Sequence, residues 1–170
     1  MKKLSKRFLN SIDACKEGVE RWEEKGSNPD LIATLKQLMQ EDKRDCANWL
    51  IVRCMNRKQR IEYAVFAARQ VLPAFEKEYP EDKRPRLAIE AAIRVMKNNT
   101  EKNRYAAEYA RSAWYAAGSA EYAAWYAAGS AGSAGSAEHA EYAAWYAGSA
   151  MMKKILRHGI KILKGENNDD

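Results

Sequence analysis

An alanine-rich aromatic repeat in the C-terminal half places the strongest limit on the fold of this chain. The block Glu-Tyr-Ala-Ala-Trp-Tyr-Ala occurs at residues 121–127 and again at 141–147, and a shorter copy, Ala-Trp-Tyr-Ala-Ala-Gly-Ser-Ala, occupies 113–120. Alanine favours helix and lets a neighbouring backbone approach closely, while each aromatic ring adds a large contact surface. The repeat contains no nucleophile, paired carboxylates or metal-ligand set, so it indicates packing and binding rather than chemistry.

The spacing within the repeat predicts two helices. From residue 106 to 131, alanines recur at alternating steps of four and three, which places them along one helical stripe. Trp145 follows Trp125 by twenty positions and would lie on the wrong face of one continuous helix. Because the glycine-containing segment 129–137 lies between them, we expect antiparallel helices over 101–128 and 138–164 joined by a turn. A single long helix and a flexible tether remain alternatives.

Apolar residues elsewhere recur every three or four positions, which is the spacing of one helix face. Asn56 and Gln59 have the spacing of a capping box, and Thr100 is a plausible N-cap for the repeat. No segment alternates as a strand would. We therefore expect an all-α multi-helix bundle of about six or seven helices, with an N-terminal domain over 1–100 and an Ala/Tyr/Trp helical hairpin over 101–165 packed on it. The five predicted N-terminal helices cover about residues 5–25, 29–41, 44–55, 57–79 and 85–97.

Charge and cysteine content narrow the class of protein. The 170 residues include 29 Lys and Arg against 23 Asp and Glu, a net charge of +6, which favours simple solubility and makes a nucleic-acid partner a weaker alternative. The three cysteines form no Cys-x-x-Cys motif, so we expect a reduced, cytoplasmic protein with the thiols as small core residues. No stretch reaches the ~18 apolar residues of a membrane span.

Sequence motifs for catalysis or metal binding are absent. His139 and His158 lack a ligand set at metal-binding spacing, and the Gly-Ser-Ala segment lacks the lysine and preceding strand of a phosphate loop. We therefore expect no enzyme activity, no cofactor and no metal site.

Two groups of residues are candidate binding sites. Arg84 and Arg86 lie at a predicted helix start, and Glu90 follows Arg86 by one turn, so this group is either an Arg86–Glu90 surface salt bridge or an anion site. The second group is the aromatic surface of the repeat with nearby arginines, which forms either core or a binding groove. We expect the hydroxyls of Tyr122 and Tyr142 to stay near solvent. The second group comprises Arg104, Arg111, Trp114, Tyr115, Tyr122, Trp125, Tyr126, Tyr142, Trp145 and Tyr146.

Three segments carry a resemblance to a known family. Residues 13–22 and 42–50 look like an N-terminal module of bacteriophage and prophage proteins. The segment Asp-Lys-Arg-Pro-Arg-Leu-Ala-Ile-Glu-Ala-Ala (82–92), followed by the aromatic repeat, resembles the immunity protein family of phages and polymorphic toxin loci. The resemblance covers most of the chain and is most specific at 82–92. It implies an all-α binding protein that neutralises an effector in a microbial conflict, and it brings no catalytic residues.

The pattern and the resemblance together predict a non-enzymatic immunity or anti-defence binding protein that neutralises an effector by sequestration. The alternative is a sponge that sequesters a small anionic nucleotide signal of host antiphage defence, with aromatic stacking beside Arg84, Arg86, Arg104 or Arg111. The expected partners are thus a protein effector or a nucleotide, with no membrane. The excess aromatic surface also predicts a homo-oligomer.

Overall fold

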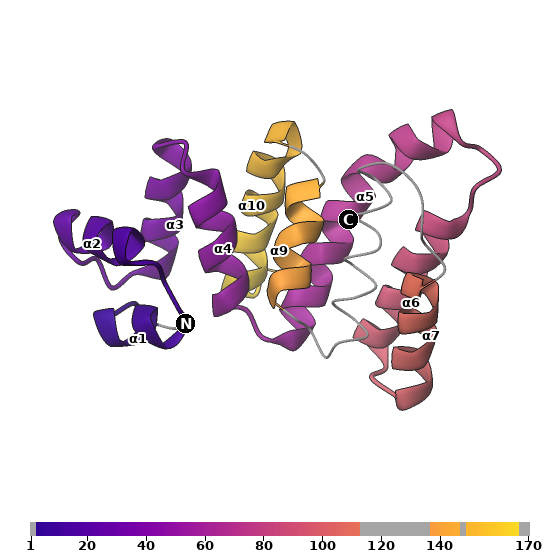
Figure 1. The fold of residues 1–170 in the computed structure, drawn as a ribbon, viewed down its shortest axis with the longest axis horizontal. Coiled ribbons are helices and arrows are strands. Elements are labelled where there is room, and N and C mark those ends of the chain that lie inside the picture. Colours follow the sequence, from indigo (N-terminus) through magenta and orange to yellow (C-terminus); the bar gives the residue numbers. More distant parts are fainter. Residues whose placement is uncertain (1–2, 113–136, 147–148, 167–170) are drawn as a thin grey trace.

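The structure, a computed structural model, describes residues 3–112, 137–146 and 149–166. Within these ranges the chain forms nine helices and no strand, which confirms the predicted all-α fold (Figure 1). Helices α4, α5, α9 and α10 lie in the middle of the molecule, with α1–α3 at one end and α6 and α7 at the other. The bounds are Lys6–Ser11 (α1), Lys16–Glu24 (α2), Leu31–Gln40 (α3), Arg44–Cys54 (α4), Arg57–Glu78 (α5), Arg84–Lys97 (α6), Glu101–Ser112 (α7), Ala137–Tyr146 (α9) and Ser149–Lys164 (α10).

The predicted helix starts at Asn56 and Thr100 are confirmed. The Asn56 side chain accepts from the Gln59 backbone N–H at 3.0 Å, and the Gln59 side chain accepts from the Asn56 N–H at 2.9 Å, which completes a capping box. The Thr100 hydroxyl accepts from the Asn103 N–H at 3.2 Å. These local hydrogen bonds satisfy backbone donors that a helix start leaves unpaired, and they define where α5 and α7 begin.

The single helix predicted over 5–25 is wrong, because two helices occupy this range. Helix α1 ends at Ser11 and α2 begins at Lys16. Between them Asp13 has a φ of 57°, in the left-handed region that interrupts a right-handed helix. The apolar spacing ran across this break because Leu9 and Val19, on separate helices, both reach the core.

The single helix predicted over 138–164 is likewise replaced by two helices, α9 and α10. Both pack against α4 and α5 in the middle of the molecule (Figure 1). The part of the predicted first hairpin helix beyond residue 112, and the expected turn up to residue 136, lie outside the described residues. The division into domains at 1–100 and 101–165 stays a prediction, although one hydrophobic core joins residues from both sides of it.

A buried hydrogen-bond chain joins α5, α4 and α9. The Tyr63 hydroxyl donates to Asn48 Oδ1 at 2.8 Å, and Asn48 Nδ2 donates to the Glu141 carbonyl at 3.0 Å. Tyr63 is 0% exposed and Asn48 2% exposed. Burial raises the pKa of the Tyr63 hydroxyl, so it stays a neutral donor. Beside these hydrogen bonds, α9 turns small side chains toward the core, so the helix lies close to its neighbours. The small side chains are those of Ala140, Ala143 and Ala144, all 0% exposed.

Helix α10 closes the core against the same tyrosine. Gly159 faces the Tyr63 ring, and a Cβ added at this glycine would lie 2.6 Å from Tyr63 Cε2 and 2.7 Å from Ile51 Cδ1. The preceding residue, His158, stacks on Phe66 with ring centroids 3.7 Å apart. Burial is the main reason that the pKa of His158 falls to about 4.

The substitution Gly159→Ala tests this close approach. Helix propensity alone would favour alanine by about 1 kcal/mol at an interior helix position. Because the added methyl group would overlap the buried Tyr63 ring, we expect the opposite sign, a loss of about 1–3 kcal/mol in the free energy of unfolding. Urea denaturation of the two proteins measures the difference, and a stabilised variant would show that α10 lies further from α5.

Candidate functional site

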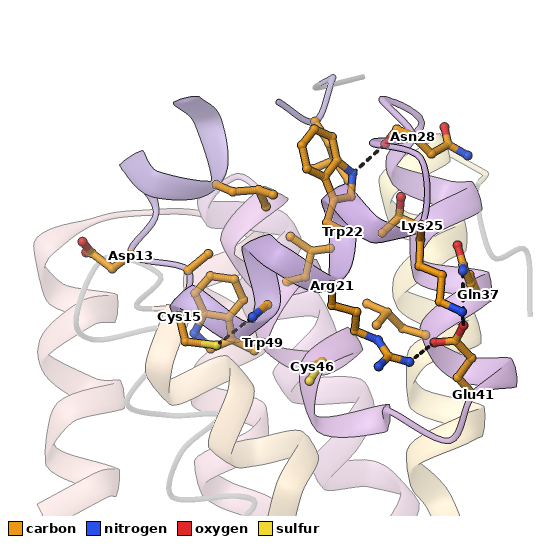
Figure 2. Close-up of a pocket in the computed structure, with 17 residues that line it drawn as sticks. Asp13, Cys15, Arg21, Trp22, Lys25, Asn28, Gln37, Glu41, Cys46 and Trp49 are labelled. Atoms are coloured by element: carbon orange, nitrogen blue, oxygen red, sulfur yellow. Dashed lines mark hydrogen bonds and ion pairs between the residues drawn. The ribbon is translucent and has the colours of Figure 1, made fainter. Parts of the chain in front are cut away.

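An open apolar pocket lies among helices α1 to α4 and has a volume of about 320 Å³ (Figure 2). Trp22 on α2 and Trp49 on α4 form two of its walls. The Trp22 ring is held in place because its Nε1 donates to the Asn28 carbonyl at 2.9 Å. The arrangement can accept an apolar group, since its hydrophobic lining comprises Leu4, Leu9, Ala14, Trp22, Leu38, Trp49 and Leu50.

One end of the pocket carries a charged cluster centred on Glu41. Its carboxylate accepts a hydrogen bond from Arg21, a second from Gln37 Nε2 at 3.2 Å, and pairs with Lys25 Nζ at 3.2 Å (Figure 2). The Arg21 hydrogen bond is the main reason that the pKa of Glu41 falls to about 2, and the bonds from Gln37 and Lys25 add to it. The cluster joins α2 to the C-terminal end of α3 and so fixes one wall of the pocket.

The cysteine prediction is right for one thiol and wrong for two. Cys54 is buried, whereas Cys15 and Cys46 are exposed and line the pocket. Cys15 is the N-cap of α2, where its Sγ accepts from the Gly18 N–H at 3.4 Å. An N-cap residue must stand outside the helix it starts, which is why this thiol is not in the core.

Trp49 connects the pocket to helix α9. The Arg53 guanidinium lies over the Trp49 ring, 4.3 Å from its centroid, and Arg53 Nη1 also pairs with the Glu141 carboxylate at 2.8 Å. Glu141 is followed on α9 by Tyr142, whose side chain is 46% exposed. We call Trp49, Arg53, Glu141 and Tyr142 the α4–α9 junction.

Sequence reasoning missed most of this junction. Of the basic residues at the end of α4 and the start of α5, Arg53, Arg57 and Arg60 are half-buried, whereas Lys58 is exposed. Burial lowers the pKa of Arg60, with the charge of Arg53 as a smaller contribution. A sequence signal did exist in α4, because Asn48 stands among apolar residues on the buried side of the helix and must find hydrogen-bond partners there.

The first predicted binding group is not brought to the pocket. Arg86 pairs with Glu76 of α5 at 2.7 Å rather than with Glu90, so the predicted Arg86–Glu90 salt bridge is wrong. Arg84 pairs with Asp82 at 2.9 Å. Glu76 was overlooked because it lies ten positions upstream, and only the packing of α6 on α5 makes it the nearer partner.

The second predicted group is only partly described. Trp114, Tyr115, Tyr122, Trp125 and Tyr126 lie outside the described residues. Arg111 lies in α7, and Trp145 and Tyr146 lie in α9. Arg104 is half-buried and donates to Asn99 Oδ1 at 3.1 Å. The exposure of Tyr142 agrees with the expectation that it stays near solvent. As binding residues, all members of both groups stay predictions.

No group of three or more His, Cys, Asp or Glu side chains that could hold a metal is present in the described ranges. His158, which has no metal-ligand set beside it in the sequence, is half-buried against Phe66. None of the described helices has the length and apolar character needed to cross a membrane.

The charged cluster predicts how stability depends on pH. The folded pKa of Glu41, about 2, lies below the usual value of 4.5, so its ion pairs stabilise the fold above pH 4.5 and the contribution is lost as pH falls towards 2. Glu41→Gln should therefore melt below the native protein at pH 6, and the difference should vanish near pH 2. Thermal melts across this range measure it, and a difference that does not change with pH would contradict the ion-pair assignment.

Comparison with known protein families gives a match over the central part of this chain. Residues 50–158 match the family model described as "Imm-5 like putative immunity protein". The matched range runs from the end of α4 into α10, and so contains most of the central core, whereas α1, α2, α3 and most of the pocket precede it. No curated protein and no solved structure matches the chain.

Proposed function

The chain belongs to the Imm-5 like family of immunity proteins, and we propose on this basis that it binds an effector protein and neutralises it by occupying its surface. The family match carries the proposal, and it confirms the resemblance first drawn from residues 82–92. Sequestration requires a stable contact surface and no chemistry on this chain. The protein is thus proposed to be non-enzymatic and to act in the bacterial cytoplasm, where a phage or prophage would express it.

The proposed contact surface is the α4–α9 junction with the adjoining pocket. Tyrosine, tryptophan and arginine are the residues that most often anchor protein interfaces, and this junction presents one of each. Arg53 is held by both Trp49 and Glu141, so its side chain is already ordered before a partner binds. The pocket beside Trp49 offers space for an apolar side chain of the partner. The aromatic residues of the repeat that lie outside the described residues stay proposed contact residues.

A nucleotide sponge has weaker support. Two of the four arginines proposed for it, Arg84 and Arg86, already pair with carboxylates, those of Asp82 and Glu76. A nucleotide phosphate would have to displace these carboxylates before it could bind. An effector protein needs no such displacement at the α4–α9 junction, which is why we favour it.

Co-expression in bacteria tests the proposed function. The protein would be produced together with each of a panel of toxin domains of different chemistry, and growth would report neutralisation. We expect it to rescue growth against at least one toxin and to co-elute with it in gel filtration. Rescue of none, combined with intact release of a cyclic nucleotide on heating the protein, would support the sponge instead. Release of a converted nucleotide would indicate an enzyme.

The substitution Tyr142→Ala locates the contact surface. Because Tyr142 is 46% exposed, its loss should change the free energy of unfolding by less than about 1 kcal/mol. An interface anchor should cost about 2 kcal/mol of binding, a roughly 30-fold rise in the Kd for the neutralised toxin. The matched control is Tyr79→Ala at the end of α5, because Tyr79 is 49% exposed. Equal losses of affinity in the two variants would contradict a role of α9 in the interface.

A homo-oligomer also stays a proposal, based on the aromatic surface of the repeat. Light scattering at micromolar concentration should give a particle of at least twice the chain mass of 19.3 kDa. A particle of one chain mass would contradict it.

A further inference from the structure

The solvent-facing side of α10 is basic along its length. Five cationic side chains are exposed there, and we call them the basic face of α10: Lys153, Lys154, Arg157, Lys161 and Lys164. The opposite side of the helix carries Met152, Ile155 and Leu156 into the hydrophobic core. Because that apolar side is anchored, the cations are held outward on a rigid element.

Four of the five cations form one stripe. Lys153, Arg157, Lys161 and Lys164 follow one another at steps of four, four and three, so they share one side of the helix. At 1.5 Å per residue the stripe is about 16 Å long. Its length suits an opposing row of several charges rather than a single small ion.

This charge arrangement costs the fold stability. Like charges four residues apart on a helix repel one another. Among the residues that the structure describes, Glu166 supplies the one carboxylate paired with the face, to Lys164 at 3.1 Å. The charge of Lys161 also contributes, after burial, to the lowered pKa of His158. A partner of opposite charge would relieve this repulsion.

We propose that the basic face of α10 binds an acidic surface on the effector protein, an inference that rests on the proposed function. Opposite charge attracts the partner during diffusion and fixes its orientation. Nucleic acid is the less favoured partner for two reasons. Four of the five cations are lysines, whereas arginine is the residue that binds phosphate in two-pronged fashion. The helix also contains no Phe, Trp or Tyr on which a base could stack.

The proposal defines the class of effector. Enzymes that act on nucleic acid present basic surfaces to their substrate, and the basic face would repel such a surface. The effector should therefore offer an acidic surface to α10. Helix α10 cannot insert into a bilayer, since its apolar side is buried in the core.

A pair of charge variants tests the proposal. The first replaces three residues of the stripe, Lys153→Gln, Arg157→Gln and Lys161→Gln. The matched control removes the same number of charges from exposed lysines of α3, α5 and α6 by Lys36→Gln, Lys77→Gln and Lys97→Gln. The stripe variant should melt at the same temperature as the native protein or higher, because like-charge repulsion is removed.

Binding is measured at low salt with two probes of equal total charge, a poly-L-glutamate peptide and duplex DNA. We expect the native protein to bind polyglutamate more tightly than DNA, and the stripe variant to lose about tenfold or more in affinity while the control changes little. Equal losses in the two variants would overturn the proposal. So would an unchanged stripe variant, or tighter binding of DNA that the stripe variant abolishes.

The co-expression assay separates failure of this inference from failure of the proposed function. A neutralised toxin should carry an acidic surface, and the stripe variant should lose rescue while the control keeps it. Rescue that survives in the stripe variant would overturn the basic face and leave the immunity role standing. No rescue of any toxin would reject the immunity role, while the polyglutamate measurement would still decide whether the face takes acidic chains.

Discussion

The architecture depends on one buried hydrogen-bond chain, from the Tyr63 hydroxyl through the Asn48 amide to the Glu141 carbonyl. Each polar group in it is removed from water, so losing one partner would leave the other buried and unsatisfied. These hydrogen bonds join the consecutive helices α4 and α5 to α9, which lies far from both in sequence. Gly159 brings α10 against the same Tyr63 ring. Tyr63 and Asn48 together thus tie four helices to one another, and generic apolar packing would not specify their positions as narrowly.

The same residues that organise the core also shape the surface. The Glu141 carbonyl is part of the buried chain, while its carboxylate pairs with Arg53 and so fixes the guanidinium over Trp49. Because Trp49 is also a pocket wall, Arg53 and Glu141 connect the pocket of α1–α4 to α9, the helix that carries the exposed Tyr142. A partner at the α4–α9 junction would meet side chains that are already ordered, which lowers the entropic cost of binding.

The two sides of helix α10 differ in character, and only the basic side is proposed to bind a partner. Its apolar side, with the stacked His158 and the close contact at Gly159, belongs to the core. Its other side holds like charges that repel one another and that the described residues barely neutralise. A rigid basic face and a preformed apolar pocket are complementary means of binding a protein, because one attracts a partner over distance and the other supplies contact area.

The sequence by itself determined the features that depend on residues close together in the chain, namely the helical fold and the helix caps. Helical periodicity predicted the all-α fold, and hydrogen bonds over three residues placed the caps at Asn56 and Thr100 correctly. The segment 82–92 pointed to the family that the match over 50–158 establishes. Periodicity did not reveal the break at Asp13, because residues on both sides of it face the same core. Tertiary structure decided the rest: that Arg86 meets Glu76, that Asn48 meets Tyr63, and that Arg53 meets Glu141. The two partners of each pair come from different helices. The charge or ring of a residue does not reveal which side chain of another helix packing will bring beside it.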